Sequence, residues 1–136
     1  MTTPINSVLH VLITDDIEQN REYFADILHK ITSDIVIEHA ASGEEALKLT
    51  ENRIRQTQRS YDLIIMDFKM PVMNGEQATN AIRQLEASTN PPVRSIIITW
   101  STSKMSPYAK ADDWLPKMTD HRTVKAKLVE LGLMIN

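Results

Sequence analysis

Length, composition and charge describe a small acidic domain. The chain has 136 residues and a formal net charge of −3, so one domain over residues 1–136 is predicted, with no electrostatic reason to bind nucleic acid. It has no apolar run of about 18 residues, so no membrane insertion is predicted. The absence of Cys excludes disulfides and thiolate metal sites and fits a cytoplasmic location. Its three glycines exclude a P-loop and a dinucleotide-binding fingerprint.

Four short apolar segments, at residues 8–14, 35–37, 63–66 and 93–98, have the composition of strands. Residues 113–116 are predicted to form a short fifth strand, at the edge of the sheet because of Pro116. Between these segments, apolar residues recur at helical spacing from 17 to about 30, from 43 towards 54, from 75 to 85 and from about 120 to 131. Ser42 and Glu45 have the spacing of a capping box at the start of the second helix. The polar residues 52–60 are expected to form the solvated end of that helix and a loop.

The alternation of strands and helices predicts an α/β, doubly wound five-stranded parallel sheet with helices on both faces. For five strands, the flavodoxin-like order 2-1-3-4-5 is favoured. We expect a short or missing fourth helix, because residues 101–111 contain Pro107 and no clear apolar stripe. Such sheets bind ligands at the carboxyl ends of the strands, where the strand order reverses.

Polar residues follow the predicted strands at this edge. Asp15 and Asp16 follow the first strand, Asp67 the third, Thr99 the fourth and Lys117 the fifth. One Asp after a strand is most often a helix cap, but independent caps would not gather at one edge. Three carboxylates within about 4 Å would repel by roughly 4 kcal/mol per pair, so a cation is expected. Oxygen ligands favour Mg²⁺ before Mn²⁺ or Ca²⁺.

This combination suits phosphoryl transfer onto a carboxylate. A Mg²⁺ ion held by few carboxylates keeps coordination sites for water and phosphate oxygens. Asp67 is then the candidate nucleophile. Lys117 would offset charge on the phosphoryl oxygens, and Thr99 would donate a hydrogen bond to one of them.

The same residues resemble those of a response-regulator receiver domain. The most specific segment is MDFKMPVMNG at residues 66–75. The acidic pair at 15–16, Thr99 after an isoleucine run and Lys117 late in the chain match the family in order and spacing. Together these features span nearly the whole chain. Residues 76–83 are similar to receivers attached to hybrid histidine kinases.

The resemblance implies that Asp67 accepts phosphate from the phosphohistidine of a histidine kinase or a histidine phosphotransfer protein. It also implies a set of Mg²⁺ ligands, which are Asp16, Asp15 through water, Asp67 and the main-chain carbonyl of Lys69. Thr99 would follow the phosphoryl group on activation. Trp114, three residues before Lys117, would reorient with it.

The chain departs from the family pattern at three places. Met118 follows Lys117 where a Pro with a cis bond is usual, so we expect a trans bond or strain there. Trp100 follows Thr99 where a small residue is usual, and it is expected to restrict access to the phosphoryl site. The third departure is the altered fourth helix, which is expected to change the output face.

Two other functions remain open. The first is a degenerate receiver that acts as a phosphorylation-independent interaction module, favoured by Met118 and the altered helix. The second is a Mg²⁺-dependent aspartyl phosphatase, which by resemblance would need an Asp where Lys69 stands. The output protein is unknown, and a homodimer is possible through the altered face. Since the chain ends five residues after Leu131, no output domain is expected to follow, and it is either a single-domain regulator or an excised domain.

Overall fold

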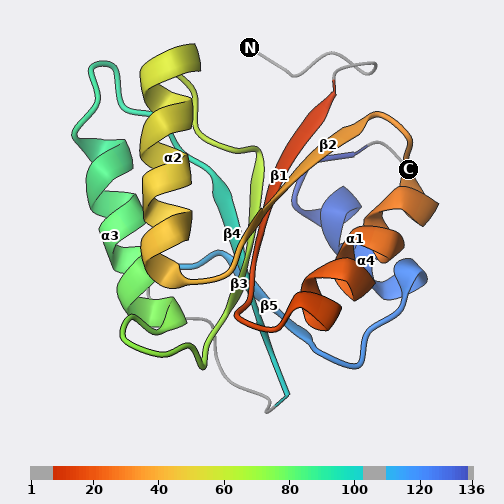
Figure 1. The fold of residues 1–136 in the computed structure, drawn as a ribbon. Coiled ribbons are helices and arrows are strands. Elements are labelled where there is room, and N and C mark those ends of the chain that lie inside the picture. Colours follow the sequence, from red (N-terminus) through yellow and green to blue (C-terminus); the bar gives the residue numbers. More distant parts are fainter. Residues whose placement is uncertain (1–7, 103–109, 135–136) are drawn as a thin grey trace.

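A five-stranded parallel sheet runs through the centre of the molecule (Figure 1). The computed structural model describes residues 8–102 and 110–134. The strands are β1 (Leu9–Thr14), β2 (Ile35–Ala40), β3 (Leu63–Asp67), β4 (Ile96–Ser101) and β5 (Asp113–Pro116). Their order is β2-β1-β3-β4-β5, and all neighbouring pairs are parallel. The predicted fold class and strand order are therefore confirmed.

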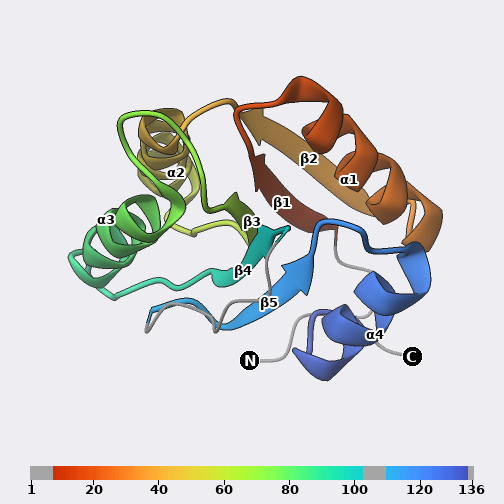
Figure 2. The same ribbon diagram turned by 90° about the horizontal axis from the view of Figure 1, so that it is seen from below.

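Helices cover both faces of this sheet. They are α1 (Glu18–Ile31), α2 (Gly43–Thr57), α3 (Gly75–Ala87) and α4 (His121–Glu130). Figure 2 shows α2 and α3 on one face and α1 and α4 on the other, as right-handed crossovers require. Within the described ranges, no helix has the length and apolar character needed to cross a membrane.

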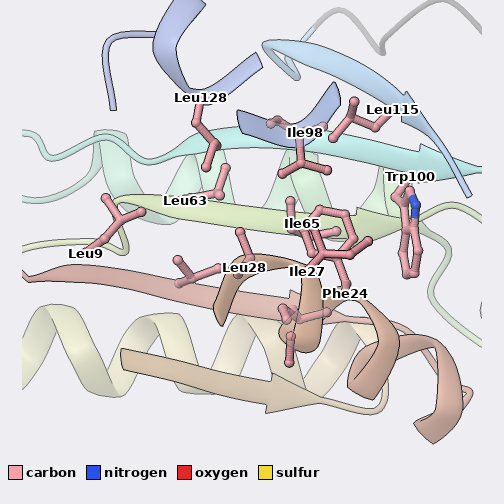
Figure 3. Close-up of a cluster of buried hydrophobic side chains, with 14 residues drawn as sticks. Leu9, Phe24, Ile27, Leu28, Leu63, Ile65, Ile98, Trp100, Leu115 and Leu128 are labelled. Atoms are coloured by element: carbon pink, nitrogen blue, oxygen red, sulfur yellow. The ribbon is translucent and has the colours of Figure 1, made fainter. Parts of the chain in front are cut away.

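The central strand β3 is buried on both faces. Leu63 and Ile65 pack in the cluster under α1 and α4 (Figure 3). Ile64 and Met66 pack in the cluster under α2 and α3. All four side chains have no exposed surface. This two-sided burial explains why the segment is a continuous apolar run instead of an alternating one.

Some boundaries differ from those predicted. Strand β4 begins later, at Ile96, and continues to Ser101. Helix α2 continues to Thr57. There the Arg53 side chain donates to the carbonyl oxygen of Ser60 at 3.0 Å. Residues 55–59 are exposed, so the predicted solvated end of this helix and the loop after it are confirmed.

The prediction of a short or missing helix over residues 101–111 lies largely outside the described residues, because 103–109 are not described. Helix α4 corresponds to the last helix that the sequence predicts, over about 120–131. Its N-cap is Asp120, whose side chain accepts a hydrogen bond from the backbone N–H of Thr123 at 2.9 Å.

Gly75 brings the start of α3 against the end of β3. A Cβ atom at this position would lie 2.1 Å from the carbonyl oxygen of Asp67, so no larger residue fits without moving the backbone. The Gly75 N–H donates to the carbonyl of Phe68 at 2.8 Å. Asn74 and Gln77 cap α3 reciprocally, as a capping box. The loop after Asp67 is therefore held tightly against the strand end.

An ion-pair cluster around Arg83 fixes the start of β5 beside β4. The Arg83 guanidinium, 10% exposed, lies 2.7 Å from Glu86 and 2.9 Å from Asp112. It also donates to the carbonyl of Ser95 at 2.7 Å. The Asp112 carboxylate in turn accepts from the backbone N–H of Ile97 at 2.8 Å. These contacts join α3 to the two strands that lead to Thr99 and Lys117.

Candidate functional site

Asp67, the last residue of β3, lies at the centre of the candidate site. It is 4% exposed, and its Oδ1 lies 3.0 Å from Nζ of Lys117. Carboxylate oxygens of Asp15, Asp16 and Asp67 all lie within 4.8 Å of one another. The carboxyl ends of β1, β3 and β5 thus bring together four of the residues that the sequence singled out.

Asp15 is held rigidly at the start of the loop before α1. It has no exposed surface, and one carboxylate oxygen accepts the backbone N–H of Ile17 at 2.9 Å. Asn20 donates to both oxygens at 3.3–3.4 Å. The Arg21 guanidinium donates to the main-chain carbonyl of Asp15 at 2.7 Å. Asn20 and Arg21 therefore orient Asp15, a role that their sequence pattern alone did not assign.

Lys117 bridges two buried carboxylates. Its Nζ lies 2.9 Å from Oδ2 of Asp15 and 3.0 Å from Oδ1 of Asp67. In the described ranges the only cis peptide bond joins Asn90 to Pro91, so the bond to Met118 is trans, one of the two expected outcomes. The lysine reaches both carboxylates with this trans bond, and the Met118 side chain is 92% exposed.

The pKa values of Asp67 and Lys117 are both raised, although burial acts on the two groups in opposite directions. Burial raises the pKa of Asp67 to about 6; the Lys117 hydrogen bond opposes this shift, and the charges of Asp15 and Asp16 add to it. Burial lowers the pKa of Lys117, but its hydrogen bonds and charge contacts with Asp15 and Asp67 outweigh burial and raise it overall. The lysine is therefore charged, while Asp67 is a carboxylate that burial makes unusually basic.

A cavity of about 300 Å³ opens beside Asp67 and Lys117. It is large enough for a phosphoryl group and several water molecules. The described residues that line it come from the ends of β1, β3, β4 and β5, and they are Asp16, Ile17, Asp67, Phe68, Lys69, Ser101, Thr102 and Lys117. Sequence reasoning did not single out Ser101 or Thr102.

Trp100 does not restrict this cavity, so the expectation that it would is wrong. Strand β4 continues past Thr99, and the alternation of side chains turns Trp100 towards α1 and α4, on the same face as Ile98. Its ring is 1% exposed and packs edge-on against Phe24, with centroids 4.9 Å apart (Figure 3). Trp100 is absent from the described residues that line the cavity.

The two predicted switch residues lie beside the cavity rather than in its described lining. The Thr99 hydroxyl donates to the carbonyl oxygen of Asp113 at 3.3 Å. Trp114 is half-buried, and its indole N–H donates to the hydroxyl oxygen of Ser101 at 3.0 Å. Ser101 therefore connects Trp114 to the cavity directly.

The donor set fits Mg²⁺. Carboxylate oxygens from three residues within 4.8 Å of one another are hard ligands, and the chain has no Cys to favour a softer metal. Asp16 is exposed and lines the cavity, whereas Asp15 is enclosed by protein donors. The exposed Lys69 also lines the cavity.

Fold and site together define a doubly wound α/β protein with an acidic, lysine-bridged pocket at the carboxyl edge of its sheet. The family model of the response regulator receiver domain matches residues 11–129. The chain therefore belongs to the receiver-domain family of two-component signalling.

Named relatives include regulators and hybrid kinases. The two-component response regulator ORR41 of Oryza sativa subsp. japonica is 35% identical over 82 residues, which are 60% of this chain and 61% of that protein. Hybrid signal transduction histidine kinase G of Dictyostelium discoideum is 35% identical over 112 residues, which are 80% of this chain and 3% of the kinase. The match thus spans about three-fifths of the rice regulator and a small part of the kinase.

Solved receiver structures have the same fold. The receiver domain of the histidine kinase CKI1 from Arabidopsis thaliana, complexed with Mg²⁺ and BeF₃⁻, superposes with a TM-score of 0.74 at 28% identity and covers 90% of both chains. The chemotaxis protein CheY4 of Vibrio cholerae superposes with a TM-score of 0.70 at 27% identity, covering 91% of this chain and 98% of that one.

Proposed function

We propose that residues 1–136 form one receiver domain in which Asp67 accepts a phosphoryl group. The observation that carries this proposal is the position of Asp67, buried at a strand end, 3.0 Å from Lys117 and within 4.8 Å of two further carboxylates. The cavity beside it gives a phosphoryl donor access to the carboxylate. The protein is then a phosphoacceptor in signalling instead of a multiple-turnover enzyme.

The transfer needs one nucleophile and fixed positive charge. An oxygen of the Asp67 carboxylate attacks phosphorus, and the phosphorus–nitrogen bond of a phosphohistidine breaks. The departing imidazole nitrogen takes the electron pair of that bond and a proton from water. The Lys117 ammonium, already held at 3.0 Å, remains beside the oxygens on which negative charge gathers. Its fixed position means that little reorganisation is required during the reaction.

Mg²⁺ would be held by Asp16 and Asp67, with Asp15 acting through water and the main-chain carbonyl of Lys69 as a further ligand. When bound, Mg²⁺ supplies positive charge that offsets the phosphoryl oxygens. Asp15 cannot turn freely towards a ligand, because its oxygens already accept from Ile17, Asn20 and Lys117. These hydrogen bonds support a role in which Asp15 binds Mg²⁺ through water and not directly.

The phosphoryl donor we propose is a histidine kinase or a histidine phosphotransfer protein, located with this chain in the cytoplasm. The similarity to a hybrid signal transduction histidine kinase supports the donor class. The lack of cysteine in a chain of this length is compatible with a reducing compartment.

The site supports the phosphoacceptor function better than the two alternatives, a degenerate receiver and an aspartyl phosphatase. The degenerate-receiver hypothesis rested partly on Met118, yet Lys117 contacts both carboxylates with Met118 in place. The aspartyl phosphatase hypothesis requires a carboxylic acid two residues after Asp67, where this chain has the cationic Lys69.

Incubation with acetyl phosphate and Mg²⁺ should add one phosphoryl group to the wild-type chain. The expected increment in intact mass disappears when Mg²⁺ is chelated by EDTA, because the carboxylates then repel the incoming anion. It also disappears in Asp67→Asn, which lacks the nucleophile. An increment that persists in Asp67→Asn, or none in the wild-type chain after Mg²⁺ binding has been shown by calorimetry, would contradict the proposal.

We further propose that Ser101 passes the presence of a phosphoryl group to Trp114. Ser101 lines the cavity and accepts the Trp114 indole N–H at 3.0 Å. A phosphoryl oxygen in the cavity would attract the Ser101 hydroxyl and disturb this hydrogen bond. The family resemblance implies that Thr99 follows the phosphoryl group on activation. For this, its hydroxyl would have to break the hydrogen bond with the Asp113 carbonyl.

The chain's two tryptophans make this proposal measurable by ¹H–¹⁵N NMR, since Trp114→Phe assigns the two indole cross-peaks. With Mg²⁺ and beryllofluoride, the Trp114 indole peak should shift in the wild-type chain. In Ser101→Ala it should start at a different position and shift little. Thr99→Val, which deletes the neighbouring hydroxyl, is the matched control and should shift as the wild type does. If the Trp114 peak instead shifted in Ser101→Ala but not in Thr99→Val, the switch would be assigned to Thr99.

A further inference from the structure

The segment that carries Lys117 is held by hydrogen bonds from other elements on both sides of the lysine. Before it, the Pro116 carbonyl accepts the indole N–H of Trp100 at 3.0 Å. At the lysine itself, the backbone N–H donates to the carbonyl of Ser101 at 2.9 Å. After it, the Thr119 carbonyl accepts the hydroxyl of Tyr23 at 2.6 Å.

The two aromatic donors are tied to the same helix. Tyr23 belongs to α1, and the next residue, Phe24, packs edge-on against Trp100 with ring centroids 4.9 Å apart. Phe24 is fully buried and Trp100 is 1% exposed, so neither ring can shift without disturbing the core. Helix α1 therefore fixes the segment around Lys117 through both Tyr23 and Trp100.

Trp100 also contacts the lysine side chain. The Lys117 Nζ lies 5.2 Å from the centroid of the Trp100 ring, within the range of a cation–π interaction. By contrast, the residue after the lysine contributes little packing, because the Met118 side chain is 92% exposed. The contacts that orient the ammonium are therefore made by other elements and not by the next residue in the chain.

We propose that Tyr23 and Trp100 are positioning residues that aim the Lys117 ammonium at Asp15 and Asp67. A lysine side chain has many rotamers, and holding its backbone on both sides with an aromatic face beside Nζ reduces the number it can adopt. The effect on phosphoryl transfer rests on the proposed function of Asp67. The structural part of the proposal, that Tyr23 fixes the backbone of Lys117, stands on the hydrogen bonds alone.

A double-mutant cycle tests the effect on reactivity. Tyr23→Phe deletes one hydroxyl group and should slow phosphorylation by acetyl phosphate and Mg²⁺ by about 3- to 10-fold. In a Lys117→Ala background, the same change should alter the rate by less than about 1.5-fold, because no ammonium remains to be aimed. An equal loss in both backgrounds, or no loss in the wild-type background, would overturn the proposal.

Tyr61→Phe is the matched control. It deletes the same atom from a tyrosine two residues before the start of β3, whose hydroxyl donates to Glu38. It should leave the phosphorylation rate within about 1.5-fold of wild type in both backgrounds. Trp100→Phe keeps an aromatic ring but removes the indole N–H, and it should behave as Tyr23→Phe does.

Amide hydrogen exchange tests the structural part without any phosphorylation. The Lys117 amide, which donates to Ser101, should exchange faster in Tyr23→Phe than in the wild type, and at the wild-type rate in Tyr61→Phe. Unchanged exchange in Tyr23→Phe would overturn the proposal. If the wild-type chain does not accept phosphate at all, the proposed function fails, whereas the exchange result still decides whether Tyr23 holds the segment.

Discussion

Replacing Lys117 by Met should slow phosphorylation of Asp67 by about 100-fold at saturating Mg²⁺, the size expected for loss of one fixed donor to a developing anion. The Lys117 Nζ lies 3.0 Å from Asp67 and 2.9 Å from Asp15, so the variant leaves two buried carboxylates without the cation between them. Both the attraction for the phosphoryl oxygens and the screening between the carboxylates are lost. The rate is measured by following intact mass over time with acetyl phosphate.

Lys127→Met is the matched control for that experiment. Lys127 lies on α4 and also has a carboxylate partner, Asp113, at 2.8 Å, but it does not line the cavity. Its loss should change the phosphorylation rate by less than about 2-fold, because neither Lys127 nor Asp113 is among the described residues that line the cavity. If Lys117→Met reacted as fast as Lys127→Met, the ammonium would have no part in the transfer.

Asp67→Asn should make the folded protein more stable at pH 7 in buffer without Mg²⁺, by up to about 3 kcal/mol. The folded-state pKa of Asp67 is raised from 3.8 to about 6, chiefly by burial. Between these two pH values the folded state binds more protons than the unfolded state. Stability from this group is therefore full below about pH 3.8 and is lost as the pH rises through about 6. The asparagine side chain of the variant stays neutral at every pH, so the variant avoids this loss.

Urea denaturation at pH 4 and pH 7 with EDTA measures this difference. The stabilisation by Asp67→Asn should be near zero at pH 4 and large at pH 7, and added Mg²⁺ should reduce it by stabilising the wild-type chain. Asp26→Asn, at an exposed position on α1, should change the free energy of unfolding by less than about 0.5 kcal/mol at either pH. A wild-type chain that is the more stable of the two at pH 7 would contradict the burial argument.

The gathering of site residues could be predicted because parallel strands all end at one edge of the sheet. Asp15, Asp67 and Lys117 each follow a predicted strand. The strand order alone then places these three residues close together. The specific segment at residues 66–75 added the family resemblance. The clustering of the site residues and the family resemblance can both be predicted without knowing the positions of the side chains.

Side-chain direction at the end of β4 was predicted wrongly, because it depends on where that strand ends. The expected strand stopped at Ile98, which left Trp100 in a loop beside the phosphoryl site. The observed strand continues to Ser101, so Trp100 alternates into the core and Ser101 reaches the cavity. Continuing the alternation from Ile98 to Trp100 is the sequence signal that could have indicated this arrangement.

Long-range positioning contacts carry no local sequence signal. Tyr23 and Thr119 are separated by 96 positions, and nothing near either residue indicates that the hydroxyl of one meets the carbonyl of the other. The same holds for Arg83 and Asp112, which are 29 positions apart. Such pairs follow from how helices pack on the sheet, so they require the three-dimensional structure.

The most direct test of Asp67 as the phosphoacceptor is to locate the phosphoryl group on the chain. After reaction with acetyl phosphate and Mg²⁺, borohydride reduces an aspartyl phosphate to homoserine, which peptide mass spectrometry assigns to one position. We predict homoserine at position 67 alone, and none when Mg²⁺ is chelated. Homoserine at position 15 or 16, or a stable phosphate on Ser101 or Thr102 in place of an acyl phosphate, would contradict it.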